Sequence, residues 1–282
     1  MISVVVAVRD GLPWLEEQLE ALVEQECDTA WEIVVADNGS LDDTVAVARR
    51  FAERCHRIRV LDASGRAGPA AARNAGVRGA RGELLMFCDA DDVVQPGWVC
   101  AGAEALRRAD VVAGCFDMVS LNDPGRSSRA GSPAPAATAQ LGFLPAGLAA
   151  NMAVRRAAFE AVGGFDEELF VGEDIDLSWR LQLAGYTFCI APDAVVAKRD
   201  PPRMRQLFRR ALTYGRCGPA LYRRYRGAGA RRELSRSVRS WGWLVLTLPW
   251  LGRLDVRRRW VHAAGVRLGR VVGSLREGVF FP

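Results

Sequence analysis

Apolar runs alternate with segments of helical periodicity over the first 90 residues of the chain. Four short runs rich in Val and Ile carry no alternating polar positions, and they cover residues 2–8, 31–36, 57–61 and 84–88. Three segments between them repeat apolar residues at the helical spacing, over 12–26, 41–54 and 68–80. Strands without a polar face are buried on both sides. The pattern therefore predicts an α/β fold with a mostly parallel sheet flanked by helices.

The pattern continues for one more pair of elements and then stops. Residues 96–108 are predicted to form a helix that Pro96 opens, and residues 110–118 a further strand. Residues 120–140 consist mainly of Pro, Gly, Ser and Ala and have little to bury. We expect them to form a mobile surface loop.

Composition and charge divide the remainder of the chain. Residues 143–197 form a second structured stretch, which we expect to complete one domain over residues 1–200. Residues 198–282 hold 21 Lys and Arg against 4 Asp and Glu, a net charge of +17, which leaves −12 for residues 1–197. We expect a basic helical extension over 201–282. Such a segment suits an anionic membrane surface or a nucleic-acid backbone, or it simply has solvated helix faces.

Cysteine usage and the first residues bear on location. The seven cysteines are scattered, with no CxxC pair, and this pattern predicts reduced, mostly buried thiols in a cytosolic protein. The first residues, "MISVVVAVRDG", lack the features of a signal peptide and are too short to span a bilayer. We expect a cytoplasmic protein.

Three aspartates follow the fourth apolar run in "LLMFCDADDV": Asp89, Asp91 and Asp92. Carboxylates this close repel one another unless a cation lies between them. Hard oxygen ligands suit Mg²⁺ or Mn²⁺, which is commonly shared with a substrate phosphate. The alternative is a turn in which an aspartate caps the next helix, and for Asp92 this is at least as good an interpretation.

Five motifs in order resemble the family 2 glycosyltransferases, inverting enzymes with the Rossmann-like GT-A fold of nucleotide-diphospho-sugar transferases. The resemblance covers about residues 1–200, and the motifs are "SVVVAVRDG", "VVADNGSLDDT", "GPAAARNAGVRGARGE", "FCDADD" and "GGFDEELFVGEDIDLSWRLQLAGY". It implies a donor half over about 1–118 and an acceptor half over 143–197. It also implies a nucleoside diphosphate sugar as donor.

The same resemblance implies a set of donor and metal contacts. Asp91, with Asp89, would hold Mg²⁺ or Mn²⁺ on the diphosphate. The residues implied to contact the donor are Ala7, Val8, Arg9, Asp10, Asp37, Arg66, Arg73, Asp89 and Ala90. Taken alone, "DNGS" is more typical of an Asx turn, and Arg73 is equally well an exposed helix arginine.

On the acceptor side, the resemblance implies that Asp174 is the general base, with Glu173 beside it. Asp176 is better interpreted as a charge that complements the helix dipole. Asn151 and Trp179 are candidate acceptor contacts, although a core position suits Trp179 better.

Two departures from the family pattern stand out. The family often carries a histidine metal ligand just after the last strand, where "AVVAKRDPP" offers Lys198 and Arg199 instead. A protonated ammonium cannot ligate a metal. The QxxRW motif and long membrane spans of processive synthases are absent from the sequence, which favours single transfer.

The segment "WGWLVLTLPWL", residues 241–251, is too short to span a bilayer and lies between arginine-rich stretches. It suits a peripheral, interfacial segment that brings the enzyme to a lipid-linked acceptor. Equally, it suits a helix packed on the main domain or across a homodimer.

Together these features predict an inverting glycosyltransferase that moves one sugar to a hydroxyl acceptor, with no nucleic-acid partner. The alternatives are a nucleotide-sugar-binding protein without catalysis, motivated by the Lys198 position, and, less well supported, a sugar nucleotidyltransferase.

Overall fold

The computed structural model describes residues 1–122 and 133–282. The chain divides into two compact units. The first contains Met1–Ser120, Pro145–Arg199 and a short segment that ends at Thr138; the second contains Ala139–Leu144 and Asp200–Pro282. Each unit is described by itself.

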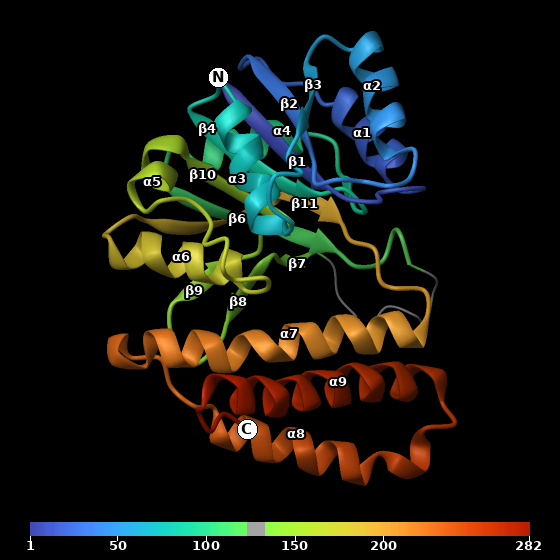
Figure 1. Cartoon of the computed structure of the whole chain (residues 1–282), viewed down its shortest axis with the longest axis vertical. Coiled ribbons are helices and arrows are strands. Elements are labelled where there is room, and N and C mark those ends of the chain that lie inside the picture. Colours follow the sequence, from blue (N-terminus) through green and yellow to red (C-terminus); the bar gives the residue numbers. More distant parts are fainter. Residues whose placement is uncertain (123–132) are drawn as a thin grey trace. The chain divides into compact units, whose positions relative to one another are not determined.

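A large sheet forms the first unit (Figure 1). Its strands follow the order β3-β2-β1-β4-β10-β6-β11-β5. Their bounds are β1 (Ile2–Val8), β2 (Trp31–Asp37), β3 (Ile58–Asp62), β4 (Leu84–Asp89), β5 (Val93–Val94), β6 (Val111–Asp117), β10 (Asn151–Arg155) and β11 (Phe188–Ala197). β1, β2, β3 and β4 are parallel, as are β6 and β11, whereas β10 runs antiparallel between β4 and β6. The predicted mostly parallel α/β fold is confirmed.

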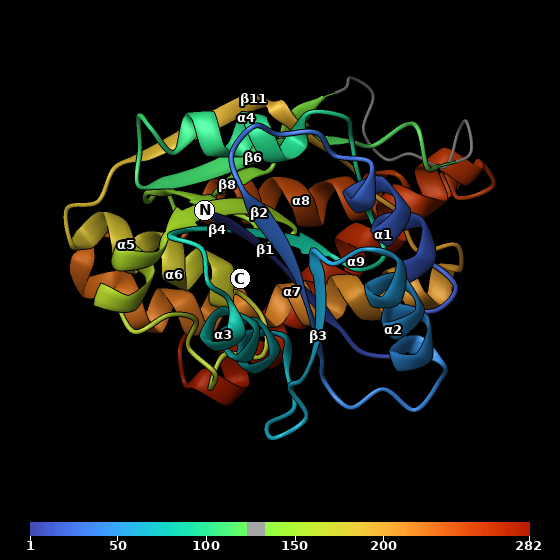
Figure 2. The same cartoon turned by 90° about the horizontal axis from the view of Figure 1, so that it is seen from above.

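Helices cover both faces of this sheet, as Figure 2 shows from above. They are α1 (Leu15–Val23), α2 (Thr44–Arg54), α3 (Pro69–Gly79), α4 (Trp98–Ala105), α5 (Arg156–Ala161) and α6 (Glu173–Leu183). Side chains of β1 alternate between the two faces: Val4 and Val6 pack with α1, α2 and α4, and Val5 packs with α3, α5 and α6. Burial on both faces is the reason that the strand sequences carry no polar alternation.

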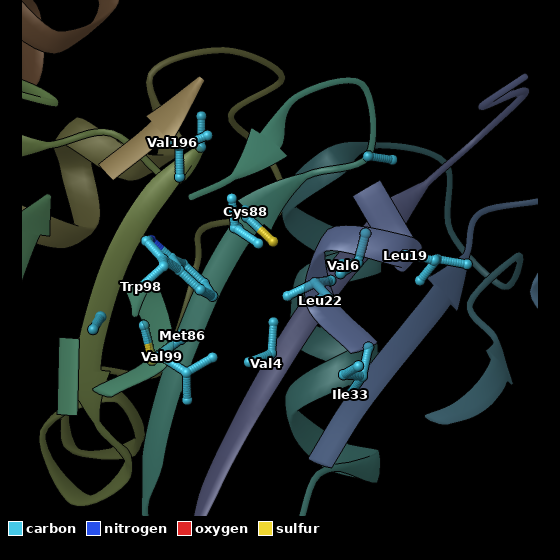
Figure 3. Packing of buried hydrophobic residues seen from close by; sticks show 14 of the residues in the cluster. Val4, Val6, Leu19, Leu22, Ile33, Met86, Cys88, Trp98, Val99 and Val196 are labelled. Carbon is cyan, nitrogen blue, oxygen red and sulfur yellow. The ribbon is translucent and has the colours of Figure 1, made fainter. Parts of the chain in front are cut away.

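The first of these two layers is shown in Figure 3, where Leu19 and Leu22 of α1 meet Val4 and Val6 of β1. Trp98 is fully buried in the same layer. Close packing here fixes the sheet against its helices, so the loops at the strand ends start from a rigid base.

The predicted loop over 120–140 is partly wrong. Its residues 123–132 lie outside the described residues, but the part after them holds β7 (Ala134–Pro135) and β8 (Ala137–Ala139). β7 pairs with β6, and β8 pairs with β9 (Pro145–Gly147). Short edge pairings of this kind need few apolar side chains, so composition did not indicate them.

The second unit contains the predicted basic helices. They are α7 (Met204–Tyr225), η1 (Arg226–Ala228), α8 (Leu234–Leu246), η2 (Leu248–Trp250) and α9 (Leu254–Glu277). α7 and α9 lie side by side, and α8 lies on the other side of α9 (Figure 1). A Cβ atom added to Gly269 of α9 would collide with the carbonyl oxygen of Leu212 on α7. Glycine is therefore what lets these two backbones approach so closely.

Two further expectations concern covalent and membrane features. The structure pairs Cys27 with Cys100 in a disulfide, with their Cα atoms 5.4 Å apart, so the prediction that all cysteines are reduced is wrong for this pair. Sequence spacing could not indicate it, because the two residues are 73 positions apart. Of the helices in the described residues, none has the length and apolar character needed to cross a bilayer.

Candidate active site at the carboxyl ends of the strands

The predicted donor residues gather at one edge of the sheet. In the parallel register, Ala7 lies opposite Asp89 and Val8 lies opposite Asp37. Arg9 and Asp10 follow directly. Ligands of open α/β sheets bind beyond this edge, because the loops that leave the strands there are free to shape a site.

Asp37 organises the turn that follows β2. Its carboxylate accepts hydrogen bonds from the backbone N–H groups of Gly39, at 3.1 Å, and of Ser40, at 3.2 Å. This is the Asx turn that the local sequence predicts. Asp10 adds to the same edge, since its backbone N–H donates to Ser40 Oγ at 2.9 Å and its carboxylate accepts from the Leu41 N–H at 2.7 Å. The loops after β1 and β2 are thus joined.

The three aspartates after β4 form one cluster. Asp89, Asp91 and Asp92 each offer a carboxylate oxygen within 4.8 Å of the others. Asp92 is buried, Asp89 is half-buried and Asp91 is exposed. Burial raises the pKa of Asp92 to about 7, against the opposing effect of Lys198. The cluster carries the hard oxygen ligands that a divalent cation prefers.

The capping role considered for Asp92 is wrong. Gly97, in the left-handed conformation, is the N-cap of α4, and no side chain caps that helix. Asp92 instead binds the chain that follows β11. Its Oδ2 accepts from the Lys198 ammonium at 2.6 Å, and its Oδ1 accepts from the Arg199 N–H at 2.9 Å.

Arg73 of α3 is buried, so the alternative of an exposed helix arginine is wrong. Its guanidinium donates to Glu173 Oε1 at 2.7 Å and to Asp89 Oδ1 at 3.0 Å. Burial opposes its charge, but the carboxylates of Asp89, Glu173 and Asp174 outweigh burial and raise its pKa. Arg73 therefore ties the end of β4 to the start of α6.

The acidic segment "GEDID" starts at Gly172, which is in the left-handed conformation and is the N-cap of α6. The helix itself begins at Glu173. Burial raises the pKa of Glu173 to about 7, and the neighbouring Asp174 charge adds to the effect. Burial also raises the pKa of Asp174. The Asp174 carboxylate is oriented by the backbone, because Oδ2 accepts from the Ala149 N–H at 3.1 Å and Oδ1 from the Ile175 N–H at 2.8 Å.

Asp176 lies in the first turn of α6, as its dipole interpretation requires, and it is buried. It also accepts a hydrogen bond from Arg180 Nε at 2.7 Å. Its carboxylate is thus held inside the unit, on a different side of the helix from the base candidate.

The two predicted acceptor contacts are placed in the interior. Trp179 is fully buried in α6, which agrees with the core position considered for it. Asn151 is 2% exposed; it accepts from Trp98 Nε1 at 2.8 Å and donates to two backbone carbonyls, of Cys115 and Ala194. These bonds use the capacity of its amide. The placement of both residues gives no support to acceptor binding.

The remaining donor candidate, Arg66, lies between β3 and α3. It forms ion pairs with Glu168 at 2.5 Å and Glu167 at 3.7 Å, and its side chain is half-exposed. Its two partners precede α6, so this pairing joins the predicted donor and acceptor segments at a second point.

Sequence reasoning missed Gln18 of α1. Its amide donates to the Asp89 carbonyl at 2.9 Å and accepts from the Val94 N–H at 3.0 Å, so it holds both ends of the aspartate loop. It lies on the buried face of α1 together with Leu15, Leu19 and Leu22. A polar residue within an apolar helix face was the signal that could have identified it.

Comparison with known proteins places this arrangement in a family. The model described as Glycosyl transferase family 2 matches residues 3–163, and the model described as Glycosyl transferase family group 2 matches residues 84–264. The glycosyltransferase AglE of Haloferax volcanii is 27% identical over 198 residues, which cover 69% of this chain and 65% of the relative. The pre-mycofactocin glycosyltransferase of Mycobacterium tuberculosis is 29% identical over 274 residues, which cover 90% of this chain and 54% of the relative. The chain thus spans less than two thirds of the length of these relatives.

Solved structures share the fold. The mannosyltransferase PcManGT from Pyrobaculum calidifontis, in complex with GDP-Man and Mn²⁺, superposes with a TM-score of 0.67 at 19% identity, over 98% of this chain and 87% of that one. S. aureus TarS 1–349 in complex with UDP-GlcNAc superposes with a TM-score of 0.56 at 17% identity, over 100% of this chain and 93% of that one.

Proposed function

The chain belongs to glycosyl transferase family 2, and we propose that this glycosyltransferase moves one sugar from a nucleoside diphosphate sugar to a hydroxyl acceptor with inversion. One observation carries the proposal. Arg73 joins Asp89, at the donor edge of the sheet, to Glu173, beside the base candidate Asp174. A donor site and a proton acceptor are thereby parts of one ion-paired network.

On the donor side, the proposal assigns the nucleotide to the loops after β1 and β2. The base and ribose would meet Ala7 to Asp10, Asp37 and Asp89, and the neighbouring Arg66, Arg73 and Ala90 remain predicted contacts. The ordered turns at Asp10 and Asp37 support this role, because a site that is already shaped loses less conformational entropy on binding.

We assign Mg²⁺ or Mn²⁺ to Asp91 and Asp89. The cluster of carboxylate oxygens within 4.8 Å has the chemistry that such an ion requires. PcManGT, with the same fold, was solved with Mn²⁺ and GDP-Man. When bound, the ion would supply positive charge to the diphosphate leaving group.

Asp174 is the proposed general base. Its carboxylate takes the proton of the acceptor hydroxyl, whose oxygen attacks the anomeric carbon from the face opposite the diphosphate. The bond from that carbon to the diphosphate oxygen breaks as the new glycosidic bond forms. Burial raises the pKa of Asp174, which makes it a stronger base than an aspartate in water.

We further propose that the second unit docks on an anionic membrane surface. Large apolar side chains at helical spacing on α8 are exposed: Leu234, Val238, Trp241 and Val245, with Leu248 after it. The exposed fractions of Val238 and Val245 are 72% and 64%. Exposed arginines flank this stripe at positions 231, 232, 236, 239, 253 and 257. Apolar side chains bordered by cations complement a bilayer with acidic headgroups. A second copy of the chain is the competing occupant.

A binding panel and a transfer assay test the proposed function. Nucleoside diphosphates and nucleotide sugars, with and without Mn²⁺, should raise the melting temperature if they bind the native state. Donor binding without transfer or donor hydrolysis would identify a binding protein. Release of pyrophosphate from a nucleoside triphosphate and a sugar phosphate would identify a nucleotidyltransferase.

A further inference from the structure

Lys198 is the only lysine in this sequence, in which Lys and Arg together number 38. It directly follows β11, where its backbone N–H donates to the Asp117 carbonyl at 2.8 Å. The parallel pairing of Ala197 with Asp117 fixes the position of this residue against β6. Its side chain is 18% exposed. The single lysine of the chain is therefore held firmly next to the donor edge of the sheet.

The ammonium of Lys198 lies between two carboxylates of the aspartate cluster. Nζ is 2.6 Å from Asp92 Oδ2 and 3.3 Å from Asp89 Oδ2. The other oxygen of Asp92 accepts from the Arg199 N–H, and the other oxygen of Asp89 accepts from Arg73. All four oxygens of these two carboxylates thus have a donor from the chain itself.

A divalent cation would have to compete for these oxygens. Each oxygen keeps a second lone pair, so an ion that binds Asp89 or Asp92 must either sit close to the ammonium or displace it. Like charges a few ångströms apart repel strongly in a partly desolvated site. An ammonium is also a compact charge with three donors on a flexible stem, so it can pivot from a carboxylate to a phosphate oxygen, whereas a planar guanidinium is less adaptable.

We propose that Lys198 is a resident cation of the donor site. Its ammonium weakens binding of a divalent cation to the free cluster, and it contacts the diphosphate of the donor. The second half of this inference rests on the proposed function, and the first half does not.

The first half is tested with Mn²⁺ alone. The concentration of free Mn²⁺ is read from its electron paramagnetic resonance signal during titration of the protein, with no nucleotide present. Lys198→Met keeps the aliphatic stem and removes the charge, so it should bind Mn²⁺ roughly tenfold or more tighter than the parent. Lys198→Arg, which keeps the charge, should stay close to the parent. Equal affinity in the parent and in Lys198→Met overturns the competition.

The second half is tested on the unaltered protein, which avoids variants that fail to fold. Growth on ¹³C-labelled lysine gives side-chain NMR signals from Lys198 alone. Addition of UDP or GDP in EDTA should shift the signal of the Lys198 Cε group, which neighbours the ammonium. A nucleotide that binds by calorimetry in EDTA and leaves this signal unchanged overturns the contact with the diphosphate.

These experiments distinguish a failure of the Lys198 proposal from a failure of the proposed donor site. If neither nucleotide binds, with or without Mn²⁺, the proposed donor site fails, and the titration with Mn²⁺ alone decides the role of Lys198. If nucleotides bind only with Mn²⁺, the donor site stands and the proposed contact of Lys198 with the diphosphate is overturned.

Discussion

Buried arginines occur in both units of the chain, but their pKa values are shifted in opposite directions. In the first unit, Arg73 donates to two carboxylates, which raise its pKa against the effect of burial. In the second unit, Arg267 donates to the Ser237 hydroxyl at 2.6 Å, and burial lowers its pKa to about 10. Burial also lowers the pKa of Arg270. The first unit thus pairs its buried cation directly with two acids, whereas in the second unit the charge of Glu233 only partly offsets burial and the neighbouring arginines.

This difference suggests different tasks for charge. In the first unit, a network of alternating charges runs from Glu173 through Arg73, Asp89 and Lys198 to Asp92, and it holds these side chains in place. In the second unit, excess positive charge is left to the surface beside the apolar stripe of α8. The first pattern fits a site that binds small ligands, and the second fits a surface that meets an extended anionic one.

The largest effect is expected from replacing Asp174, the proposed general base beside the charge network of the first unit. Asp174→Asn keeps the size and one hydrogen-bond acceptor but cannot take a proton, so transfer should fall by about 10²- to 10⁴-fold while donor affinity is nearly unchanged. Initial rates and donor calorimetry measure both quantities. In the parent, the rate should rise with pH through the raised pKa of Asp174, because the base acts only when deprotonated.

The matched control is Glu160→Gln, on the exposed face of α5, which should transfer normally. Normal transfer by Asp174→Asn, together with a loss of transfer in Glu173→Gln, would show that Glu173 and not Asp174 is the base. The proposed donor site would still stand.

The next prediction concerns the effect of the buried Glu173 carboxylate on the free energy of unfolding. The pKa of Glu173 is about 7 in the folded protein, against an ordinary value of 4.5, so the folded protein binds more protons than the unfolded chain between these values. Stability should fall as pH rises from 4.5 to 7, by on the order of 3 kcal/mol from this group. Urea denaturation from pH 5 to 8 should show a shallower loss in Glu173→Gln than in the parent. Parallel curves for the two proteins would contradict the raised pKa.

A third prediction tests whether close packing of α7 and α9 stabilises the positively charged second unit. Gly269→Ala places a methyl group against the Leu212 carbonyl and should destabilise the packing of α7 and α9 by about 1–3 kcal/mol. Gly242→Ala, on α8, meets nothing within 4 Å and should be neutral or stabilising by up to about 1 kcal/mol. Guanidinium unfolding measures both variants. Equal stability of the two variants would show that the close approach of α7 and α9 does not contribute to the free energy of unfolding.

The smallest expected effect concerns the surface of the second unit. The double variant Val238→Asp, Val245→Asp should bind anionic vesicles roughly tenfold more weakly than the parent, because it removes exposed apolar side chains and adds negative charge. Binding of the parent should weaken with salt and be lost on neutral vesicles. Leu41→Asp in the first unit, where Leu41 is 89% exposed, is the control.

Vesicle flotation and sedimentation separate the possible occupants of the α8 stripe. A parent protein that ignores anionic vesicles but dimerises, with dimerisation lost in the double variant, would assign the stripe to a second copy of the chain.

Much of the fold was predictable because the strands are buried on both faces. The apolar run over 2–8 is β1 itself, and the runs at 31–36 and 84–88 fall one residue short of β2 and β4. The order of the sheet was not predictable. β10 enters antiparallel between β4 and β6, and such pairing depends on how distant segments pack rather than on local sequence.

The same division holds at the site. Local sequence put Asp37 and Asp89 at strand ends, since polar residues directly followed apolar runs. It could not predict that Asn151 and Trp179 are both buried, because burial depends on which helix covers which strand. Arg73 meets Glu173 across 100 positions of sequence, and Lys198 meets Asp92 across 106. By itself, the sequence determined the strands and the acids at their ends. The tertiary structure alone decided which cations lie between those acids, because charge pairing is set by distance in space and by exclusion of water.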